Sequence, residues 1–549
     1  MKKSSIIILL IAIVIFAACL RFYNLGSNPP SLTWDEAAWG YNAYSLGIDG
    51  KDEFGKFLPI TYLESFGDFK PPLYAYLDIF PVKLFGLNEF ATRFPSAFFG
   101  VLTVLLTFFL VKEIFPNFER KKVIPIALIS SLLLAISPWH ILLSRAAFEA
   151  NVASFLIVLG VFLFLYSIKR RSWLFVFSIV SFVLSMYTFN TARIVVPLLV
   201  LGLTIGMGKE IIGGFVKKFI VSAVVGFIIF LPLLLFLLTP QASLRYQEVN
   251  IFTDPSIVQR SNQEIENDNQ AFWSKVIHNR RVNYGIEYLK HYFDNLKPDY
   301  LFIKGDGNPK FSIQDVGQMY IWEIPFFLSG LFIIFRKRGK YFWIIPYWLI
   351  VGIIPAGVAR ETPHALRTET ILPTIQIITA IGLFFLISNM KKEWGKINIQ
   401  KIAIVAIILI AIFNFLYFYH NYFAHYSNTY SGEWQYGYKQ AVNYTNSVSG
   451  DYDKIAFTTD LGRPYIYFLF YNKYDPALFA KNANIYRESL GFVHVNSFSK
   501  YIFSNDLQSI KRNDNKILYV DVPDKVSADA KILKEFKLLN GKPALTVYE

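Results

Sequence analysis

Residues 4–22 read SSIIILLIAIVIFAACLRF, and their apolar character indicates the fold class. It follows Lys2 and Lys3 and holds no charged residue before Arg21. A run of about 20 apolar residues is long enough to cross a bilayer as a helix, which satisfies its own backbone hydrogen bonds in lipid. Ten more apolar runs follow, near 92–111, 123–139, 152–168, 173–187, 194–207, 219–239, 320–335, 341–358, 370–389 and 402–418. The sequence therefore predicts a polytopic α-helical membrane protein with about eleven transmembrane helices.

The composition agrees with this class. Of the 549 residues, 54% are hydrophobic and 17% are charged, whereas soluble domains carry roughly 25% charged residues. The net charge of +14 could suggest a nucleic-acid binder, but the basic residues lie between apolar runs instead of clustering on a polar surface, so no nucleic-acid partner is expected. The single cysteine, Cys19, excludes a disulfide within the chain and a cysteine-based metal cluster.

The first run has a second interpretation. FAAC, ending at Cys19, faintly resembles a lipoprotein cleavage box, as in a signal peptide. Arg21 follows without a small polar cleavage region, and the later spans also favour a retained transmembrane helix.

The distribution of Lys and Arg predicts the orientation of the chain. The N-terminus and alternate loops carry 20 of these residues, whereas the short opposite loops carry only Arg145, Arg193, Arg360 and Arg367. Basic loops stay in the cytoplasm. The N-terminus is therefore expected to be cytoplasmic, with residues 23–91, 240–319 and 419–549 outside. Segment 71–86 is short and contains Asp78, so we expect it to lie along the outer interface instead of crossing the membrane.

The sequence changes character after the last apolar run. Short β-like runs at 454–459, 516–522 and 543–549 alternate with helical stretches such as 437–448. Such alternation is typical of an α/β domain. We therefore predict a membrane domain over 1–423 and a small extracytoplasmic α/β domain over 424–549.

The first outer loop contains SLTWDEAAWGYNAYSLG at 31–47, where a helix is expected to begin near Trp34. Thr33 and Glu36 have the spacing of a capping box, which explains Glu36 structurally. Asp35 is not needed for that cap. A carboxylate kept ionised by a helix N-terminus also suits a general base, so a catalytic role for Asp35 stands beside the purely structural one.

Two further motifs add charges. Lys70 precedes a proline pair in GDFKPPLY (67–74), where it could reach lipid headgroups or hold a phosphate. Arg145 and Glu149 are four residues apart, as in a helical salt bridge. However, a carboxylate at the start of a span is costly unless it is paired or used, and the two interpretations of Glu149 are weighted equally.

The loop at 359–369 breaks the charge rule, because it places two arginines outside. Thr362 and Pro363 are expected to start a helix, so that His364 and Arg367 point from one face of its first turns. A helix N-terminus with Arg and His makes a phosphate cradle, whereas Arg367 alone could reach a headgroup. In the loop at 240–319, Arg245, Tyr246, His278, Arg280 and Arg281 precede glycine turns without a recognisable motif. No nucleotide-binding or hydrolase motif appears in the chain.

The motifs together resemble a known superfamily. Asp35-Glu36 in the first outer loop, FKPPLYAYL (69–77), NEFATRFPSAFFGVL (88–102) and SRAAFEAN (144–151) are similar to the GT-C glycosyltransferases related to protein O-mannosyltransferases and the lipid A aminoarabinose transferase. The resemblance covers about residues 5–390. It implies a GT-C fold and an inverting enzyme that moves a sugar from a polyprenyl-phosphate carrier to a lipid, glycan or protein acceptor at the outer membrane face.

The resemblance also implies roles for individual residues. The catalytic group comprises Asp35 as general base with Glu36 beside it, and Glu149, a position that is often Asp in close relatives. The donor phosphate would be held by Lys70, His364 and Arg367, with Arg145 as a further candidate. Some relatives use a divalent ion and others none, and this sequence shows no decisive ligand cluster, so the cofactor is left open. The sugar, mannose-like or another hexose or pentose, is also open.

Two other classes remain as alternatives. A multi-pass transporter would place charged or broken helices near the bilayer midplane and show related halves. A membrane-anchored binding protein would use its tail and leave Asp35 and Lys70 dispensable. The candidate polar residues lie at outer helix ends, which favours the glycosyltransferase.

Overall fold

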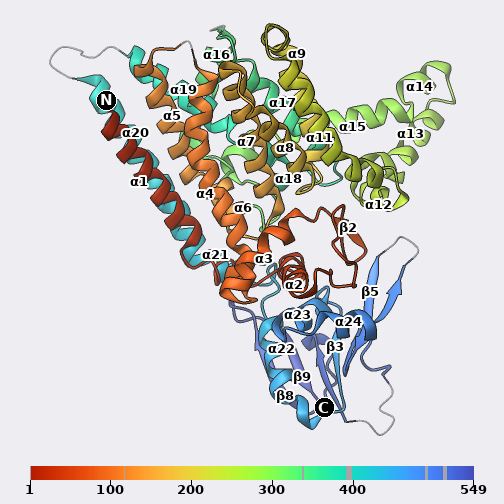
Figure 1. The fold of residues 1–549 in the computed structure, drawn as a ribbon. Helices are drawn as coiled ribbons and strands as arrows, with labels where there is room; N and C mark the ends of the chain where they lie inside the picture. The colour runs from red at the N-terminus through yellow and green to blue at the C-terminus, as the bar shows by residue number, and fades with distance from the viewer. Residues whose placement is uncertain (1, 117, 337–338, 391–397, 489–491, 511–515) are drawn as a thin grey trace. The chain divides into compact units, whose positions relative to one another are not determined.

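The structure is a computed structural model of the chain (Figure 1). It describes all residues except 1, 117, 337–338, 391–397, 489–491 and 511–515, and for residues 244–248, which include Arg245 and Tyr246, it describes the backbone alone. The chain forms two compact units. The helical unit comprises Met1–Ala17, Gly100–Leu142 and Ala153–Phe418, and the mixed unit comprises Ala18–Phe99, Leu143–Val152 and Tyr419–Glu549.

Each of the eleven apolar runs coincides with a helix. These are α1 (Lys3–Phe22), α4 (Glu89–Ile114), α5 (Arg120–Ile136), α7 (Glu149–Arg170), α8 (Phe175–Met186), α9 (Ala192–Gly206), α11 (Val216–Leu237), α16 (Ile324–Arg336), α17 (Ile344–Gly357), α19 (Thr374–Asn389) and α20 (Ile399–His420). Among the described residues, five helices are long and apolar enough to span a membrane, or up to seven if each of two bent helix pairs is one span. A membrane protein with several apolar helices is confirmed, and the count of about eleven spans stays a prediction.

Close helix packing holds the helical unit together. α16 and α19 approach each other at Gly330 and Gly382, where an added Cβ would lie 1.9 Å from the Ile378 carbonyl oxygen and 1.8 Å from the Phe326 carbonyl oxygen. Small residues allow such approach in membranes. Short elements connect the long helices: α6 (Pro138–Arg145), α10 (Gly208–Ile212), η2 (Asp299–Ile303), η3 (Ile321–Glu323), α18 (Ala365–Thr368) and η4 (Glu369–Ile371).

The loop at 240–319 is largely helical. It contains α12 (Pro240–Val249), η1 (Ile251–Thr253), α13 (Pro255–Asn267), α14 (Phe272–Ile277) and α15 (Arg280–Asp294). Figure 1 shows α13, α14 and the beginning of α15 projecting from the helices of the same unit. We call residues 255–295 the arm.

A seven-stranded sheet dominates the tail. Its strand order is β4-β5-β6-β3-β7-β9-β8, formed by β3 (Lys454–Thr458), β4 (Asn484–Arg487), β5 (Val493–Phe498), β6 (Tyr501–Ser504), β7 (Ile517–Asp521), β8 (Ile532–Lys537) and β9 (Pro543–Tyr548). β3 pairs in parallel with β6 and β7, and the outer strands pair antiparallel. The helical elements of the tail are η5 (Asn421–His425), α21 (Tyr426–Tyr430), α22 (Tyr438–Ser447), η6 (Ser449–Asp451), α23 (Pro464–Tyr471), α24 (Pro476–Asn482) and η7 (Pro523–Lys525). β3, β7, β9 and α22 coincide with the four elements expected from the sequence.

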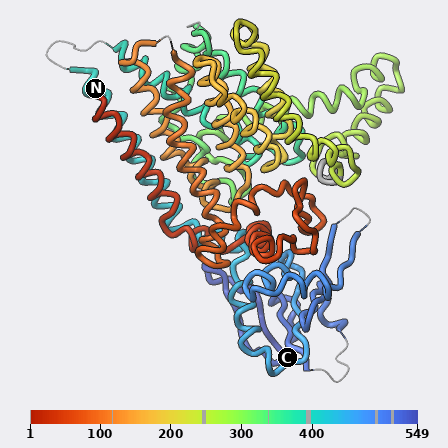
Figure 2. Tube along the Cα trace, in the orientation of Figure 1, coloured from red at the N-terminus to blue at the C-terminus, as the bar shows by residue number. Residues whose placement is uncertain are grey.

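The tail shares one hydrophobic core with the first outer loop. That loop contains α2 (Trp34–Asp49), the hairpin strands β1 (Leu63–Ser65) and β2 (Asp68–Lys70), and α3 (Leu73–Phe85). Tyr41 of α2 and Ile466 and Phe470 of α23 belong to the same buried cluster, and Figure 2 shows these two segments side by side. α23 is buried from Pro464 to Phe470 because PYIYFLFY offers no charged face to water. The compact unit that contains the tail also includes Ala18–Phe99 and Leu143–Val152. The domain boundary at residue 424 stays a prediction.

Candidate active site

The predicted capping box at the start of α2 is confirmed. The Thr33 hydroxyl accepts from the Glu36 backbone N–H at 3.3 Å, and the Thr33 backbone N–H donates to Glu36 Oε2 at 3.0 Å. This cap fixes where the helix begins, so Trp34 and Asp35 occupy its first turn. A carboxylate in that turn is stabilised by the helix dipole.

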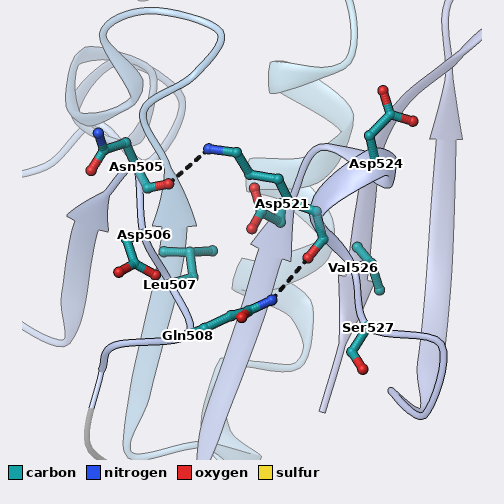
Figure 3. Close-up of a pocket in the computed structure, with 9 residues that line it drawn as sticks. Asn505, Asp506, Leu507, Gln508, Asp521, Asp524, Val526 and Ser527 are labelled. Atoms are coloured by element: carbon teal, nitrogen blue, oxygen red, sulfur yellow. Dashed lines mark hydrogen bonds between the residues drawn. The ribbon is translucent and has the colours of Figure 1, made fainter.

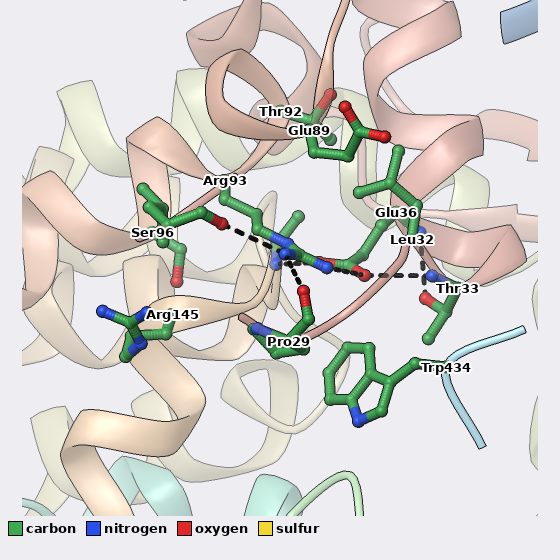
Figure 4. A network of polar contacts seen from close by, with 12 residues as sticks. Pro29, Leu32, Thr33, Glu36, Glu89, Thr92, Arg93, Ser96, Arg145 and Trp434 are labelled. Carbon is green, nitrogen blue, oxygen red and sulfur yellow. Dashed lines mark hydrogen bonds and ion pairs between the residues drawn. The ribbon is translucent and has the colours of Figure 1, made fainter. Parts of the chain in front are cut away.

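Glu36 lies at the centre of a buried network (Figure 4). Arg93 Nε donates to Glu36 Oε1 at 2.8 Å and Arg93 Nη2 donates to Oε2 at 3.1 Å. The Ala147 backbone N–H also donates to Oε1, at 2.9 Å. Arg93 further donates to the carbonyls of Leu25, Pro29 and Ser31. Glu36 therefore joins the first loop, α4 and the segment before α7.

Asp35 differs from its neighbour because it faces outward. Its carboxylate forms an ion pair with Lys70 Nζ, and its side chain is 53% exposed whereas that of Lys70 is 10% exposed. Lys70 is the last residue of β2, and its ammonium also lies 5.0 Å from the ring centroid of Phe66 and 5.3 Å from that of Trp39. The structure therefore brings together a reachable carboxylate and a cation held in place by aromatic rings.

Arg145 does not form the expected i,i+4 pair with Glu149. Its guanidinium donates to the carbonyls of Leu20, Arg21 and Asn28 and to the Tyr422 hydroxyl. Loop geometry explains the difference, because Arg145 ends α6 whereas Glu149 begins α7. Glu149 instead interacts electrostatically with Lys70 and Asp35. Of these two residues, Glu149 interacts with the charges of the candidate site. Arg145 instead holds backbone segments together through its hydrogen bonds to their carbonyls.

His364 and Arg367 belong to the helical unit. The helix expected to begin at Thr362 and Pro363 is α18, which begins at Ala365. That expectation is wrong because the Thr362 hydroxyl donates to Asp294 Oδ2 at 2.9 Å instead of capping a helix.

The backbone N–H groups of this segment are also engaged. His364 N–H donates to Asn295 Oδ1 at 2.9 Å, and Ala365 N–H donates to Asp306 Oδ2 at 2.6 Å. Burial raises the pKa of Asp306 to about 6. A carboxylate thus occupies the helix N-terminus where the sequence suggested a phosphate. Because these backbone N–H groups are engaged, a phosphate at this segment would have to be bound by the side chains of His364 and Arg367, which are partly buried.

Sequence reasoning missed two buried carboxylates, Glu53, which interacts electrostatically with Lys70, and its neighbour Asp52. Glu53 is fully buried, its Oε1 accepts from the Ser65 hydroxyl at 2.6 Å, and its backbone N–H donates to Asn42 Oδ1 at 2.9 Å. Burial raises the pKa of Glu53 to about 8, although Lys70 acts to lower it. Asp52 is buried beside it, and burial also raises its pKa. Neither residue stands in a recognisable motif, so the sequence carried no signal for them.

The tail supplies further residues next to the first loop. Gly462 adopts φ +123°, and a Cβ there would lie 2.6 Å from the Trp34 ring. The Arg463 guanidinium lies 5.4 Å from the Phe66 ring centroid and donates to the Val493 carbonyl at 3.0 Å. The Tyr467 hydroxyl donates to the Leu32 carbonyl at 3.1 Å. The contacts of Gly462, Arg463 and Tyr467 with the first loop join residues some 400 positions apart in the chain, which no local pattern reveals.

The described residues contain no group of three or more His, Cys, Asp or Glu side chains that could hold a metal ion. A separate cavity of about 530 Å³ lies at the ends of β6 and β7 (Figure 3). Asp506, Gln508, Asp521 and Asp524 line it, together with Lys525, which forms an ion pair with Asp460 at 2.5 Å. None of the predicted site residues lies in this cavity.

Comparison with known proteins supports the resemblance found in the sequence. Residues 11–252 match the family model of dolichyl-phosphate-mannose-protein mannosyltransferase. The structure is similar to that of ArnT from Cupriavidus metallidurans bound to undecaprenyl phosphate, with a TM-score of 0.56 and 11% identity over 100% of this chain and 98% of that chain. It is also similar to the Archaeoglobus fulgidus oligosaccharyltransferase tethered with an acceptor peptide, with a TM-score of 0.52 and 14% identity.

The extent of these matches differs. The oligosaccharyltransferase match covers 85% of this chain and 63% of that one. An uncharacterized protein of Aquifex aeolicus (strain VF5) is 28% identical over 200 residues. The match covers 36% of this chain and 36% of the relative, so the chain spans about a third of that relative's length. The likeness to these structures shows that the chain has the GT-C fold, as the resemblance in sequence implied.

Proposed function

We propose that the protein is an inverting glycosyltransferase that takes a sugar from a polyprenyl-phosphate carrier at the outer membrane face. The observation that carries the proposal is the exposed Asp35 carboxylate in the first turn of α2, in contact with the nearly buried Lys70. A lipid-linked donor brings its own leaving group. The protein then needs a base for the acceptor and a cation for the departing phosphate, and these two residues supply both.

The proposed reaction is a single displacement. The acceptor hydroxyl oxygen attacks the anomeric carbon of the sugar, and the bond from that carbon to the phosphate oxygen breaks. The hydroxyl proton passes to Asp35, and the electron pair of the broken bond leaves with the polyprenyl phosphate. Lys70 turns from Asp35 to the developing phosphate charge, which frees the carboxylate to accept the proton. His364 and Arg367 are proposed as further phosphate contacts.

The geometry suggests different roles for the other predicted residues. Glu36 accepts four hydrogen bonds in a buried network, so we propose that it positions Asp35 and does not touch the substrate. Arg145 is engaged with backbone carbonyls and is proposed as a brace instead of a phosphate ligand. Glu149 stays a catalytic candidate because it interacts with both Asp35 and Lys70. The sugar and the acceptor, whether lipid, glycan or protein, are to be identified by experiment.

The test is a transfer assay with purified protein, polyprenyl-phosphate sugars and a panel of membrane-lipid, glycan and protein acceptors. Asp35→Asn should lower transfer by about 10²–10⁴-fold, the usual contribution of a general base, without loss of thermal stability. Asp49→Asn is the matched control, because Asp49 ends the same helix and pairs with Lys51 at 3.4 Å. Lys70→Ala should weaken the response to donor. Normal turnover by Asp35→Asn would exclude Asp35 as the base.

A further inference from the structure

The arm exposes an apolar surface that the proposed chemistry does not use. On α14, Phe272 is 84% exposed, and Trp273, Val276 and Ile277 are each more than half exposed. On α15, Val282, Ile286, Leu289 and Phe293 are between 41% and 59% exposed. We call these eight residues the arm surface. Eight large apolar side chains exposed on two consecutive helices are unusual for a surface in water, so something is expected to cover them.

The spacing of these residues shows that the surface on α15 is a single face. Intervals of four, three and four residues return to the same side of a helix. The opposite side of α15 packs against α17, where Tyr292 donates to the Ile350 carbonyl at 2.9 Å, and against the segment after α17, where a ring nitrogen of His291 lies 2.8 Å from the Ala359 carbonyl oxygen. The exposed face is therefore left over after α15 has packed within its own unit.

The neighbouring helix indicates what covers the arm surface. α17 arises from one of the apolar runs, and the side chain of Ile350, beside the Tyr292 contact, is itself 55% exposed. In a membrane protein, such a side chain faces lipid. The arm surface thus begins next to a lipid-facing helix and extends away from it along α15 and α14.

Charge on the arm is divided in a way that fits a membrane surface. α14 and α15 (272–294) carry Lys275, Arg280, Arg281 and Lys290 against two carboxylates, Glu287 and Asp294, of which Asp294 lies at the last position of α15. By contrast, residues 255–268 carry Glu264, Glu266 and Asp268 against one cation, Arg260. Basic residues around an apolar helix face attract anionic headgroups, and long basic side chains reach those headgroups while their stems stay in the apolar region.

We propose that the arm docks on the bilayer, with α14 and the exposed face of α15 in the interfacial layer of an anionic phospholipid surface and α13 in water. Phe272 and Trp273 are the anchors at its tip, in keeping with the preference of aromatic rings for the membrane interface. The arm ends at Asp294 and Asn295, which hold Thr362 and His364. Docking thus fixes the segment that carries His364 relative to the lipid surface. The proposal does not depend on the transferase activity.

The single native cysteine makes the test direct. In a Cys19→Ala background, a nitroxide label is placed at Phe272→Cys, at Leu289→Cys and, as a matched control on the exposed polar side of α13, at Gln263→Cys. The full chain is reconstituted into vesicles of phosphatidylcholine and phosphatidylglycerol. Collision of each label with oxygen, which concentrates in lipid, is compared with collision with a water-soluble nickel complex.

The labels at 272 and 289 should favour oxygen, whereas the label at 263 should favour nickel. In vesicles of phosphatidylcholine alone, the preference for oxygen should decrease at 272 and 289, because the anionic headgroups are missing. Equal nickel access at all three positions would overturn the proposal. So would dipolar broadening at 272 or 289 that disappears when labelled protein is diluted with unlabelled protein, because that result would mean that a second copy covers the surface.

Discussion

Asp35 and Glu36 are adjacent in the chain and have opposite surroundings. The cap at Thr33 fixes the first turn of α2, so that the side chain of Glu36 turns inward to Arg93 and that of Asp35 turns outward to Lys70. An inward carboxylate fully engaged in hydrogen bonds is suited to hold a structure, whereas a reachable carboxylate is suited to take a proton. One local motif thus supplies both a structural and a chemical group.

The pair of Glu36 and Arg93 should be essential for stability. Both side chains are fully buried, so Arg93→Met would leave an uncompensated charge on Glu36. Breaking a buried pair by removing one partner costs about 3–5 kcal/mol. Glu36→Gln combined with Arg93→Met should cost less than the sum of the single changes, because each change removes the same interaction. Thermal unfolding in detergent would measure this, and a stable Arg93→Met protein would contradict it.

Glu53 should make stability depend on pH. Its pKa is about 8 in the folded protein against an ordinary value of 4.5. Between these values the unfolded chain has lost this proton and the folded chain keeps it, so folding stability falls as pH rises, by up to about 1.4 kcal/mol per pH unit. Glu53→Gln cannot ionise. The difference between the unfolding temperature of Glu53→Gln and that of the wild type should therefore increase in favour of the variant from about pH 5 to pH 8.

Asp52 provides an internal control for that experiment. Burial also raises its pKa, so it changes stability in the same direction. It is present in both proteins, and its contribution largely cancels in the comparison. Parallel pH profiles for wild type and Glu53→Gln would mean that Glu53 ionises normally in the folded state.

Among the helices and strands, the sequence predicted individual elements better than the packing of those elements on one another. Apolar runs and the Thr33 cap are local patterns, because their free energy comes from residues within a few turns, and they marked the helices and the start of α2 correctly. The union of the tail with the first loop depends on α23 packing on α2. Contacts such as Gly462 on Trp34 join distant residues, and neither composition nor spacing reports them.

That contact leads to a prediction about the loop between β3 and α23. Gly462→Ala should lower both stability and transfer, because φ +123° strains any residue with a side chain and the added Cβ would collide with the ring next to Asp35. Gly450→Ala is the matched control in the same tail, since nothing lies within 4 Å of a Cβ at that position. Unfolding temperatures and transfer rates would be measured for both. Identical behaviour of the two variants would show that the loop does not shape the site.

At the scale of the whole molecule, function depends on which side of the membrane the mixed unit occupies. The asymmetry of 20 against four basic residues in alternate loops predicts that this unit lies outside, where a polyprenyl-phosphate sugar is proposed to be used. The tail and the first loop share one core, so a single orientation must hold for both. Sidedness can thus be measured at either segment.

We expect cysteines at Ile60 and Ser447, both exposed in the mixed unit, to react with a membrane-impermeant maleimide in intact cells in a Cys19→Ala background. Lys121→Cys, whose native side chain is 79% exposed between α4 and α5, should react only after permeabilisation. Ser65 is unsuitable as a labelling position in the same loop, because it is buried and its hydroxyl donates a hydrogen bond to Glu53. A cysteine there would fail to react because it is buried, whichever side of the membrane it is on. The reverse labelling pattern would place Asp35 and Lys70 in the cytoplasm and would rule out transfer at the outer face, whatever the activity of the purified protein.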